Sequence, residues 1–290
     1  MCGIVGYTGR KESSAVLISG LKALEYRGYD SAGLAVEEQE GIKIVKSVGK
    51  VAVLESEVSK SSIHGTTGIA HTRWATHGKP TTFNSHPHGD CTGDIAVVHN
   101  GIIENYQPLK EELIQKGHIF KSETDTEVIA HLLEEELKAV SDNFEERFLQ
   151  AVSEVSKKLE GSYAIGVLWK KAQGMIIGSR VKSPLVCGAG DNENFLGSDV
   201  SAFNQWTRRA VYLDDYDIVL LKENEIKIYD SKLHEKYYNI IALEHGAEST
   251  SKNGYEHYML KEINEQPVTV RSTIEAVLKD INTAFGITKE

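Results

Sequence analysis

The second residue of the chain, Cys2, follows the initiator methionine and precedes a short apolar run. Removal of Met1 would leave a thiol whose nearest base is its own α-amino group. A free α-amine titrates near pH ~7.7–8.0 and a cysteine near ~8.5, so around neutral pH the amine can accept the thiol proton. Nucleophile and base would then belong to one residue. Gly3 permits close approach of a neighbouring segment, and the run through Tyr7 predicts a buried strand.

A second concentration of polar chemistry lies in the run His-Thr-Arg-Trp-Ala-Thr-His-Gly at residues 71–78. Such a mixture is poor material for a core but typical of a binding loop. Arg73 offers a planar fork that can hold a carboxylate through two parallel hydrogen bonds, and Thr76 and His77 are flanking donors. The structural alternative is a strand end with a surface arginine and a core Trp74.

Asn100 and Gly101 end an apolar strand candidate at residues 95–99. The side-chain amide of Asn100 and the backbone N–H of Gly101 are neutral donors that could face a developing oxyanion. The alternative is a simple hairpin, because Asn-Gly is a common two-residue turn. Residues 122–127 carry Asp125 near a predicted helix start, where the helix dipole stabilises a carboxylate. If Arg73 holds an α-carboxylate, Asp125 is the best-placed anion for the matching α-ammonium.

Composition narrows the class of partner. The 290 residues are 40% hydrophobic and 26% charged, with 32 Lys and Arg against 42 Asp and Glu, a net charge of −10. This balance argues against nucleic acid and against an anionic membrane face, and favours a small-molecule partner. The sequence has no membrane-helix or signal-peptide pattern, so we expect a cytoplasmic protein.

No metal site is expected from the sequence. The three cysteines, at positions 2, 91 and 187, form no CxxC pair and cannot all be paired in disulfides within the chain, so at least one thiol should stay free. Four histidines lack the spacing of known metal motifs, and we interpret them as surface or structural residues. These are His64, His86, His88 and His131.

Short strand patterns, many of them in consecutive hairpins, predict an α+β fold with antiparallel sheets. Helices are expected at residues 14–24, from a capping box at Thr124–Glu127 onward, and at 144–159, with a further one near 200–206. A polar, turn-rich stretch at 244–254 predicts a linker. Beyond it we expect two helices broken at Pro267, too short to bury a core of their own. The expected domains are therefore residues 1–240 and 241–290.

Five motifs, taken together and in order, resemble the class II, N-terminal-nucleophile glutamine amidotransferases, and most closely the glutaminase domain of the glucosamine-6-phosphate synthase family. They are Cys2–Gly6, Tyr26–Gly33, His71–Gly78, His99–Ile102 and Ser122–Glu127. The resemblance covers roughly residues 2–240, and residues 257–267 look like the entry into the sugar-isomerase portion of those enzymes.

The resemblance implies a four-layer αββα sandwich with two antiparallel sheets, and hydrolysis of L-glutamine without a cofactor. It makes Cys2 the nucleophile and assigns the oxyanion hole to Asn100 and Gly101. Substrate binding would fall to Arg73, Thr76, His77, Asp125 and Gly101, with Arg27 and Gly28 beside the nucleophile and Trp74 gating the ammonia passage.

By the same resemblance, a sugar-isomerase portion would follow at the C-terminus and the full-length enzyme would be a homo-oligomer. The 290 residues alone should then release ammonia from glutamine without aminating fructose 6-phosphate. Two alternatives remain. One is the glutaminase domain of another class II amidotransferase, such as asparagine synthetase or the phosphoribosyl-pyrophosphate enzyme. The other is a non-catalytic interaction domain of the same fold.

Overall fold

The structure is a computed structural model that describes residues 2–28, 30–74, 78–138, 142–243 and 254–285. Internal contacts divide the chain into two units, Met1–Glu244 and His245–Glu290. This division lies close to the predicted one after residue 240. The predicted linker at 244–254 falls outside the described residues except for Gly254.

Five α-helices and two short 3-10 helices are described in the first unit. The helices are α1 (Ser13–Leu24), α2 (Val51–Lys60), α3 (Tyr106–Gln115), α4 (Glu127–Leu137) and α5 (Phe144–Lys158), with η1 (Glu25–Arg27) and η2 (Val200–Ala202). The predictions of α1, α4 and α5 are confirmed. The helix expected near 200–206 is only the 3-10 turn η2, and α2 and α3 were not predicted.

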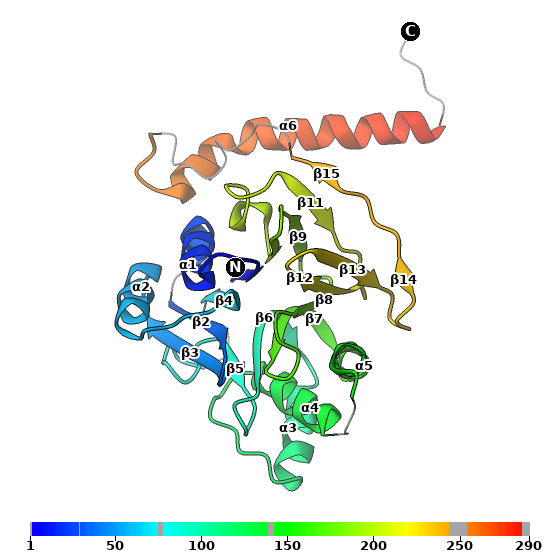
Figure 1. Ribbon diagram of the computed structural model, residues 1–290. Helices are drawn as coiled ribbons and strands as arrows, with labels where there is room; N and C mark the ends of the chain where they lie inside the picture. The colour runs from blue at the N-terminus through cyan, green and yellow to red at the C-terminus, as the bar shows by residue number, and fades with distance from the viewer. Residues whose placement is uncertain (1, 29, 75–77, 139–141, 244–253, 286–290) are drawn as a thin grey trace. The chain divides into compact units, whose positions relative to one another are not determined.

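Two antiparallel sheets form the centre of this unit (Figure 1). The eight-stranded sheet has the order β15-β11-β9-β10-β1-β4-β2-β3, and the seven-stranded sheet has the order β14-β13-β12-β8-β7-β6-β5. The strands of the first sheet are β1 (Gly3–Thr8), β2 (Ser31–Glu38), β3 (Gly41–Val48), β4 (Thr67–Arg73), β9 (Val186–Ala189), β10 (Asn194–Gly197), β11 (Arg209–Tyr212) and β15 (Ile241–Ala242). Those of the second are β5 (His88–Gly89), β6 (Ile95–Ile103), β7 (Gly161–Trp169), β8 (Ile176–Val181), β12 (Ile218–Lys222), β13 (Glu225–Tyr229) and β14 (Glu235–Lys236).

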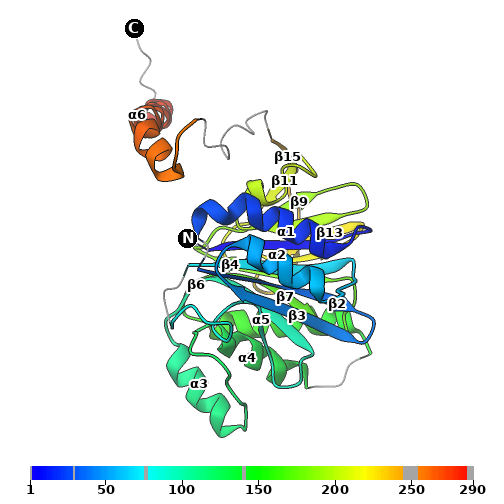
Figure 2. The same ribbon diagram turned by 90° about the vertical axis from the view of Figure 1, so that its left-hand side faces the viewer.

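Three apolar clusters separate four layers. Ile4, Ile69 and Val98 belong to a cluster formed between the sheets. A second cluster joins the eight-stranded sheet to α1 and α2, and a third joins the seven-stranded sheet to α4 and α5. Figure 2 shows the resulting order, with α1 and α2 on one side of the stacked sheets and α4 and α5 on the other. The predicted αββα sandwich with antiparallel sheets is therefore confirmed.

The predicted capping box at Thr124–Glu127 is wrong. Helix α4 begins at Glu127, and Thr126 makes no side-chain cap hydrogen bond. The Glu127 carboxylate instead accepts hydrogen bonds from the backbone N–H groups of Lys121 and Ser122. A carboxylate at a helix start satisfies whichever backbone donors the chain brings to it, and here the preceding loop folds back and supplies them.

In the residues of the second unit that the structure describes, the chain forms one helix, α6 (Tyr258–Phe285), which has Pro267 in its interior. The predicted break at Pro267 is therefore wrong. A proline removes one backbone hydrogen bond and costs about 3 kcal/mol, and the many other bonds of a 28-residue helix outweigh that loss. Apolar side chains of α6 such as Val268 and Ile274 are exposed, so this helix buries no core of its own. Among the described residues, no helix combines the length and apolarity needed to cross a bilayer.

Candidate active site

Strand alternation directs three of the predicted site residues into the space between the sheets, two from the eight-stranded sheet and one from the seven-stranded sheet. In β1, Ile4 lies in the layer between the sheets, so Cys2, two residues earlier, points to the same side. In β4, Ile69 lies in this layer, and Arg73 is four residues later in the same strand, so its side chain points to the same side. In β6 of the opposite sheet, Val98 lies in the layer and Asn100 comes two residues later. All three side chains therefore face the space between the sheets, at its end.

The register of the first sheet brings Cys2 to the end of β4. Gly3 pairs with Thr72, so Cys2 is adjacent to Arg73 and Trp74. The backbone N–H of Trp74 donates a hydrogen bond to Cys2 Sγ at 3.2 Å. A Cβ atom on Gly3 would lie 2.7 Å from Thr72 Oγ1 and 2.9 Å from Leu24 Cβ. The close approach predicted at Gly3 is thus present, although side chains make it.

The thiol of Cys2 is not a ready-made thiolate. Burial raises its pKa above the ordinary value, and the Trp74 N–H and the charge of Arg73 oppose that shift only in part. At neutral pH the sulfur therefore keeps its proton, and a nucleophilic role requires a base.

Asn100 is held in one orientation by two partners. Its Oδ1 lies 2.9 Å from His71 Nε2, and its Nδ2 donates to the backbone oxygen of Cys2 at 3.2 Å. The reverse amide orientation would set two oxygens against each other at Cys2 and is therefore excluded. An amide nitrogen carries two protons, so one remains for a second acceptor beside Cys2.

His71 fixes this orientation because it stays neutral. The ring is buried, and desolvation lowers its pKa to about 3. Neutral His71 therefore donates from Nε2 to Asn100. Its ring stacks on His86 with centroids 4.0 Å apart, and His86 meets His88 edge-on at 4.7 Å. Burial also lowers the pKa values of His86, His88 and His99.

Gly101 occupies a position that only glycine fits. Its φ is +132°, and a Cβ atom there would lie 2.0 Å from the backbone oxygen of Ser162. The hairpin alternative for Asn100-Gly101 is wrong, since both residues lie within β6 and pair with Ala164 and Tyr163 of β7.

Arg73 and Asp125 supply opposite charges at the same end of the sandwich. Arg73 is 3% exposed, and its guanidinium donates to the backbone oxygens of Gly78 and Lys79 at 3.3 and 3.4 Å. Desolvation lowers its pKa, against the opposing charges of Cys2, Asp125 and Asp30. The alternative of a surface arginine is therefore wrong. Asp125 Oδ2 accepts a hydrogen bond from Ile103 N at 2.8 Å, which ties the start of α4 to β6.

Of the other predicted site residues, Trp74, Arg27 and Gly28 are described by the structure, whereas two are not. Trp74 is 54% exposed, so it is not a core residue, and it packs on Gly28, where a Cβ would lie 3.0 Å from Trp74 Cβ. Arg27 belongs to η1, beside Gly28. Thr76 and His77 lie outside the described residues. Sequence reasoning did not single out Asp30 or the partnership of His71 with Asn100, because no local pattern links residues so far apart in the chain.

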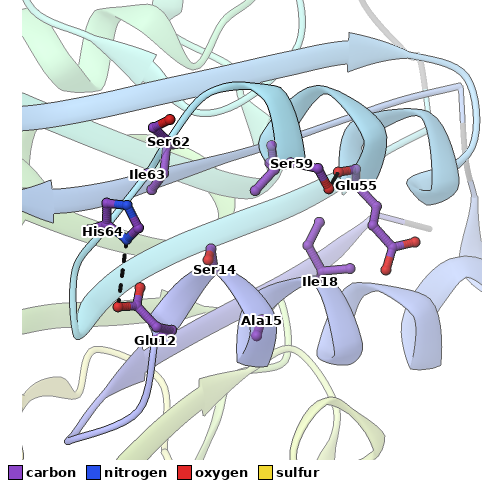
Figure 3. A pocket seen from close by; sticks show the side chains of 10 residues that line it. Glu12, Ser14, Ala15, Ile18, Glu55, Ser59, Ser62, Ile63 and His64 are labelled. Atoms are coloured by element: carbon purple, nitrogen blue, oxygen red, sulfur yellow. Dashed lines mark hydrogen bonds and ion pairs between the residues drawn. The ribbon is translucent and has the colours of Figure 1, made fainter.

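A surface hollow of about 480 Å³ between α1 and α2 is separate from these residues (Figure 3). Its lining includes Glu12 and His64, whose side chains approach to 3.8 Å, together with Glu55 and Ile63. No predicted site residue lines it. The hollow therefore brings together none of the residues predicted to act on a substrate.

Comparison with known proteins identifies the class. The model of a family described as a glutamine amidotransferase domain matches residues 76–205. Among solved structures, glutamine phosphoribosylpyrophosphate amidotransferase from B. subtilis has a TM-score of 0.65 at 24% identity, over 81% of this chain and 50% of that one. At 24% identity this structural likeness supports the fold alone. The chain is a glutamine amidotransferase of the N-terminal-nucleophile fold.

Comparison with curated proteins identifies one family within this class. Proteins named glutamine–fructose-6-phosphate aminotransferase [isomerizing] match from Caldanaerobacter subterraneus (45% identity, 100% of this chain, 47% of the relative) and Methanosarcina mazei (48%, 98% and 46%). A third, from Thermus thermophilus, is 46% identical over 97% of this chain and 45% of its own length. The chain spans about half the length of these relatives and corresponds to their glutaminase part.

Proposed function

We propose that this chain hydrolyses L-glutamine to glutamate and ammonia through a γ-glutamyl thioester on Cys2. The observation that carries the proposal is the meeting of Cys2 with Asn100, whose amide is held 3.2 Å from the Cys2 backbone oxygen by the neutral ring of His71. A nucleophile and a fixed donor from opposite sheets are thus side by side, as an acyl transfer requires.

The first step forms the thioester. After loss of Met1, the α-amine of Cys2 takes the thiol proton and sulfur attacks the side-chain amide carbon of glutamine. The second Nδ2 proton of Asn100 and the N–H of Gly101 stabilise the oxyanion. The amine then returns its proton to the leaving nitrogen, and the C–N bond breaks to release ammonia. Burial of the thiol, which raises its pKa, favours a mechanism with an internal base of this kind.

The second step reverses the roles. Water attacks the thioester while the amine accepts a proton from it, the same donors hold the oxyanion, and the C–S bond breaks to give glutamate and the free thiol. Arg73 binds the α-carboxylate through its planar fork and Asp125 binds the α-ammonium. We also assign substrate contacts to Thr76, His77, Arg27 and Gly28, and an ammonia gate to Trp74.

The ammonia is proposed to serve amination of fructose 6-phosphate, the reaction for which the curated relatives are named. A sugar-isomerase portion, a homo-oligomeric whole enzyme and a cytoplasmic location belong to the same proposal. Since residues 1–290 correspond to less than half of each relative, we expect them to release ammonia without forming glucosamine 6-phosphate.

Intact-mass analysis with a glutamine-analogue electrophile such as diazo-oxo-norleucine tests the proposal. We expect one adduct, mapped to Cys2, on a chain that lacks Met1, and no ammonia release from the Cys2→Ala variant. Cys91 and Cys187 serve as internal controls. Labelling at either of these, full-rate ammonia release from protein that retains Met1, or formation of glucosamine 6-phosphate by the 290 residues alone would contradict it.

A further inference from the structure

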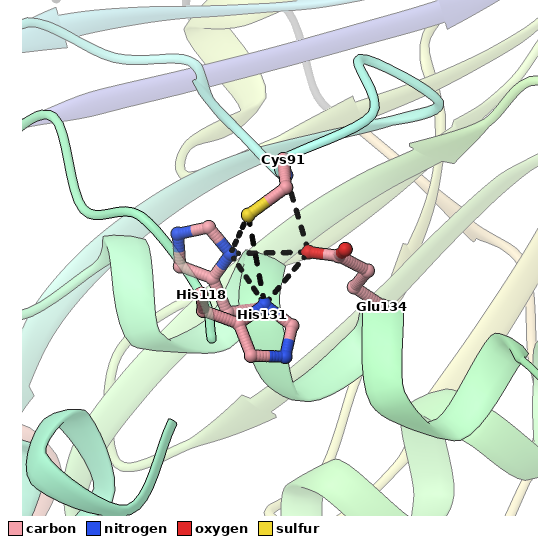
Figure 4. A group of neighbouring side chains, drawn as sticks. All are labelled: Cys91, His118, His131 and Glu134. Atoms are coloured by element: carbon pink, nitrogen blue, oxygen red, sulfur yellow. Dashed lines mark hydrogen bonds and ion pairs between the residues drawn. The ribbon is translucent and has the colours of Figure 1, made fainter. Parts of the chain in front are cut away.

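Four side chains converge away from the glutaminase site, on the side of α4 that meets the β5–β6 loop (Figure 4). Cys91 lies in that loop, His118 follows α3, and His131 and Glu134 lie one turn apart on α4. One ligand atom from each side chain lies within 4.8 Å of the other three. Figure 4 shows the sulfur, two ring nitrogens and a carboxylate oxygen pointing toward a common centre.

The end of α3 explains how His118 reaches α4. Gly117 has a φ of +93°, and the N–H groups of Gly117 and His118 donate to the backbone oxygens of Ile114 and Leu113. This is the hydrogen-bond pattern of a Schellman motif, which ends a helix and reverses the chain. His118 is thereby set against His131.

Five of the six separations are close to the edges of a tetrahedron around zinc, and the sixth, between Cys91 Sγ and Glu134 Oε2, is no more than 4.8 Å. Two nitrogens bound to Zn²⁺ should lie about 3.3 Å apart, and a sulfur and a nitrogen about 3.6 Å apart. The two histidine Nδ1 atoms are 3.2 Å apart, and Cys91 Sγ lies 3.7 Å from each. Glu134 Oε2 lies 2.9 Å from His118 Nδ1 and 3.2 Å from His131 Nδ1.

Hydrogen bonding alone accounts poorly for this arrangement. Each neutral ring nitrogen has one proton or one lone pair, directed along one line. Yet each Nδ1 is close to the other ring, to Cys91 Sγ and to Glu134 Oε2 at once. A single cation at the centre satisfies all four atoms together.

The surroundings also suit a cation. His118 presents its other nitrogen to Glu135 Oε1 at 2.6 Å, the carboxylate–histidine pairing that orients metal ligands. The N–H of Ile119 donates to Cys91 Sγ at 3.4 Å, a contact that supports a thiolate. The rings of His118 and His131 are 3% and 0% exposed, whereas Cys91 is exposed and offers an entry path.

We propose that Cys91, His118, His131 and Glu134 form a structural Zn²⁺ site. One thiolate and one carboxylate neutralise the charge of the ion, which suits a largely buried centre. Four protein ligands leave no open position, and this distinguishes a structural site from a catalytic one. The interpretation of His131 as merely a surface or structural histidine is revised accordingly.

Bound zinc would join three segments that are distant in the sequence, the β5–β6 loop, the end of α3 and the middle of α4. Binding releases the Cys91 thiol proton to solvent, so affinity should fall as the pH is lowered. Removal of the metal should therefore lower the thermal midpoint of unfolding, and should do so whether or not the chain hydrolyses glutamine.

Metal analysis of the untagged 290-residue chain, equilibrated with ZnSO₄ and desalted, provides the direct test. We expect one zinc ion per chain, and a lower melting temperature after removal with a chelator. Cobalt substitution should give the visible bands of tetrahedral Co²⁺ and a thiolate-to-cobalt charge-transfer band, which Cys91→Ser should remove. Cys2→Ser is the matched control, and it should keep the metal and both absorptions.

A measurement on the unmodified protein guards against a variant that does not fold. Peptide mapping after iodoacetamide should show Cys91 modified in the metal-free chain and protected after zinc is added. Substoichiometric zinc, an absent charge-transfer band, or Cys91 alkylation that zinc does not slow would each overturn the proposal. Because Cys2 takes no part in these readouts, their failure is distinguishable from failure of the proposed glutaminase function.

Discussion

Acidification should destabilise this protein through the buried histidine that orients Asn100. Folding lowers the pKa of His71 to about 3, whereas an unfolded histidine titrates near 6.5. Between these values the unfolded chain binds a proton that the folded chain excludes, so stability falls as the pH falls. By linkage, His71 alone should remove about 2 kcal/mol of unfolding free energy between pH 7 and pH 5.

Other buried groups also contribute to the change in unfolding free energy between pH 7 and pH 5. The lowered pKa values of His86, His88 and His99 act in the same direction. Glu37 opposes them, because burial raises its pKa to about 7 and acidification relieves its buried charge, a gain of about 2 kcal/mol over the same range. A comparison of variants cancels the contributions that do not involve His71, such as that of Glu37.

The assay is urea unfolding of the wild type and of His71→Gln at pH 7 and at pH 5. Glutamine can still donate an N–H toward Asn100 but does not titrate, so the wild type should lose about 2 kcal/mol more than the variant on acidification. His64→Gln is the matched control, because it makes the same substitution at a histidine that is 78% exposed and lies away from Asn100. Equal losses in the wild type and His71→Gln would refute the reasoning. Imidazole NMR titration of the wild type gives the same answer if the variant does not fold.

Three substitutions test the proposed substrate contacts by steady-state kinetics. Asn100→Ala should reduce kcat roughly 10²–10³-fold with little change in the KM for glutamine, and near-normal turnover would remove Asn100 from the oxyanion hole. Arg73→Lys should raise KM because an ammonium cannot reproduce the planar fork, and an unchanged KM would contradict the carboxylate contact. Asp125→Asn should raise KM about 10- to 100-fold, from loss of a charged hydrogen bond, while its amide oxygen keeps the bond to Ile103 N and preserves the melting temperature. A fall in melting temperature without a change in KM would show that Asp125 is structural.

The spacing of apolar residues in the sequence predicted those helices that bury several side chains on one face. Helix α5 carries Phe148, Val152 and Val155 at helical spacing, and all three are buried. The missed helices bury much less, only Val51 and Leu54 in α2 and only Leu113 in α3. With one or two buried side chains per helix, the apolar period is too weak to stand out from a loop.

The candidate site was predictable in its residue types but not in its assembly. Cys2, Arg73 and Asn100 attract attention because thiol, guanidinium and amide side chains in those settings suit acyl transfer. Their alignment depends on register, since Gly3 must pair with Thr72 for Cys2 to reach Arg73, and a slip of one residue would turn the side chains of β1 to the helical face. No local sequence pattern predicts that the strands pair in this register.

The same reasoning explains why the zinc ligands escaped notice while Cys2 did not. A nucleophile with its own base needs no distant partner, so position two in the chain is a sufficient signal. A four-ligand centre depends on contacts between residues as far apart as Cys91 and Glu134, and only His131 and Glu134 have a local relation, three residues apart on one helix face. Chemistry contained in one residue can be predicted from sequence, whereas chemistry shared between elements requires the fold that brings them together.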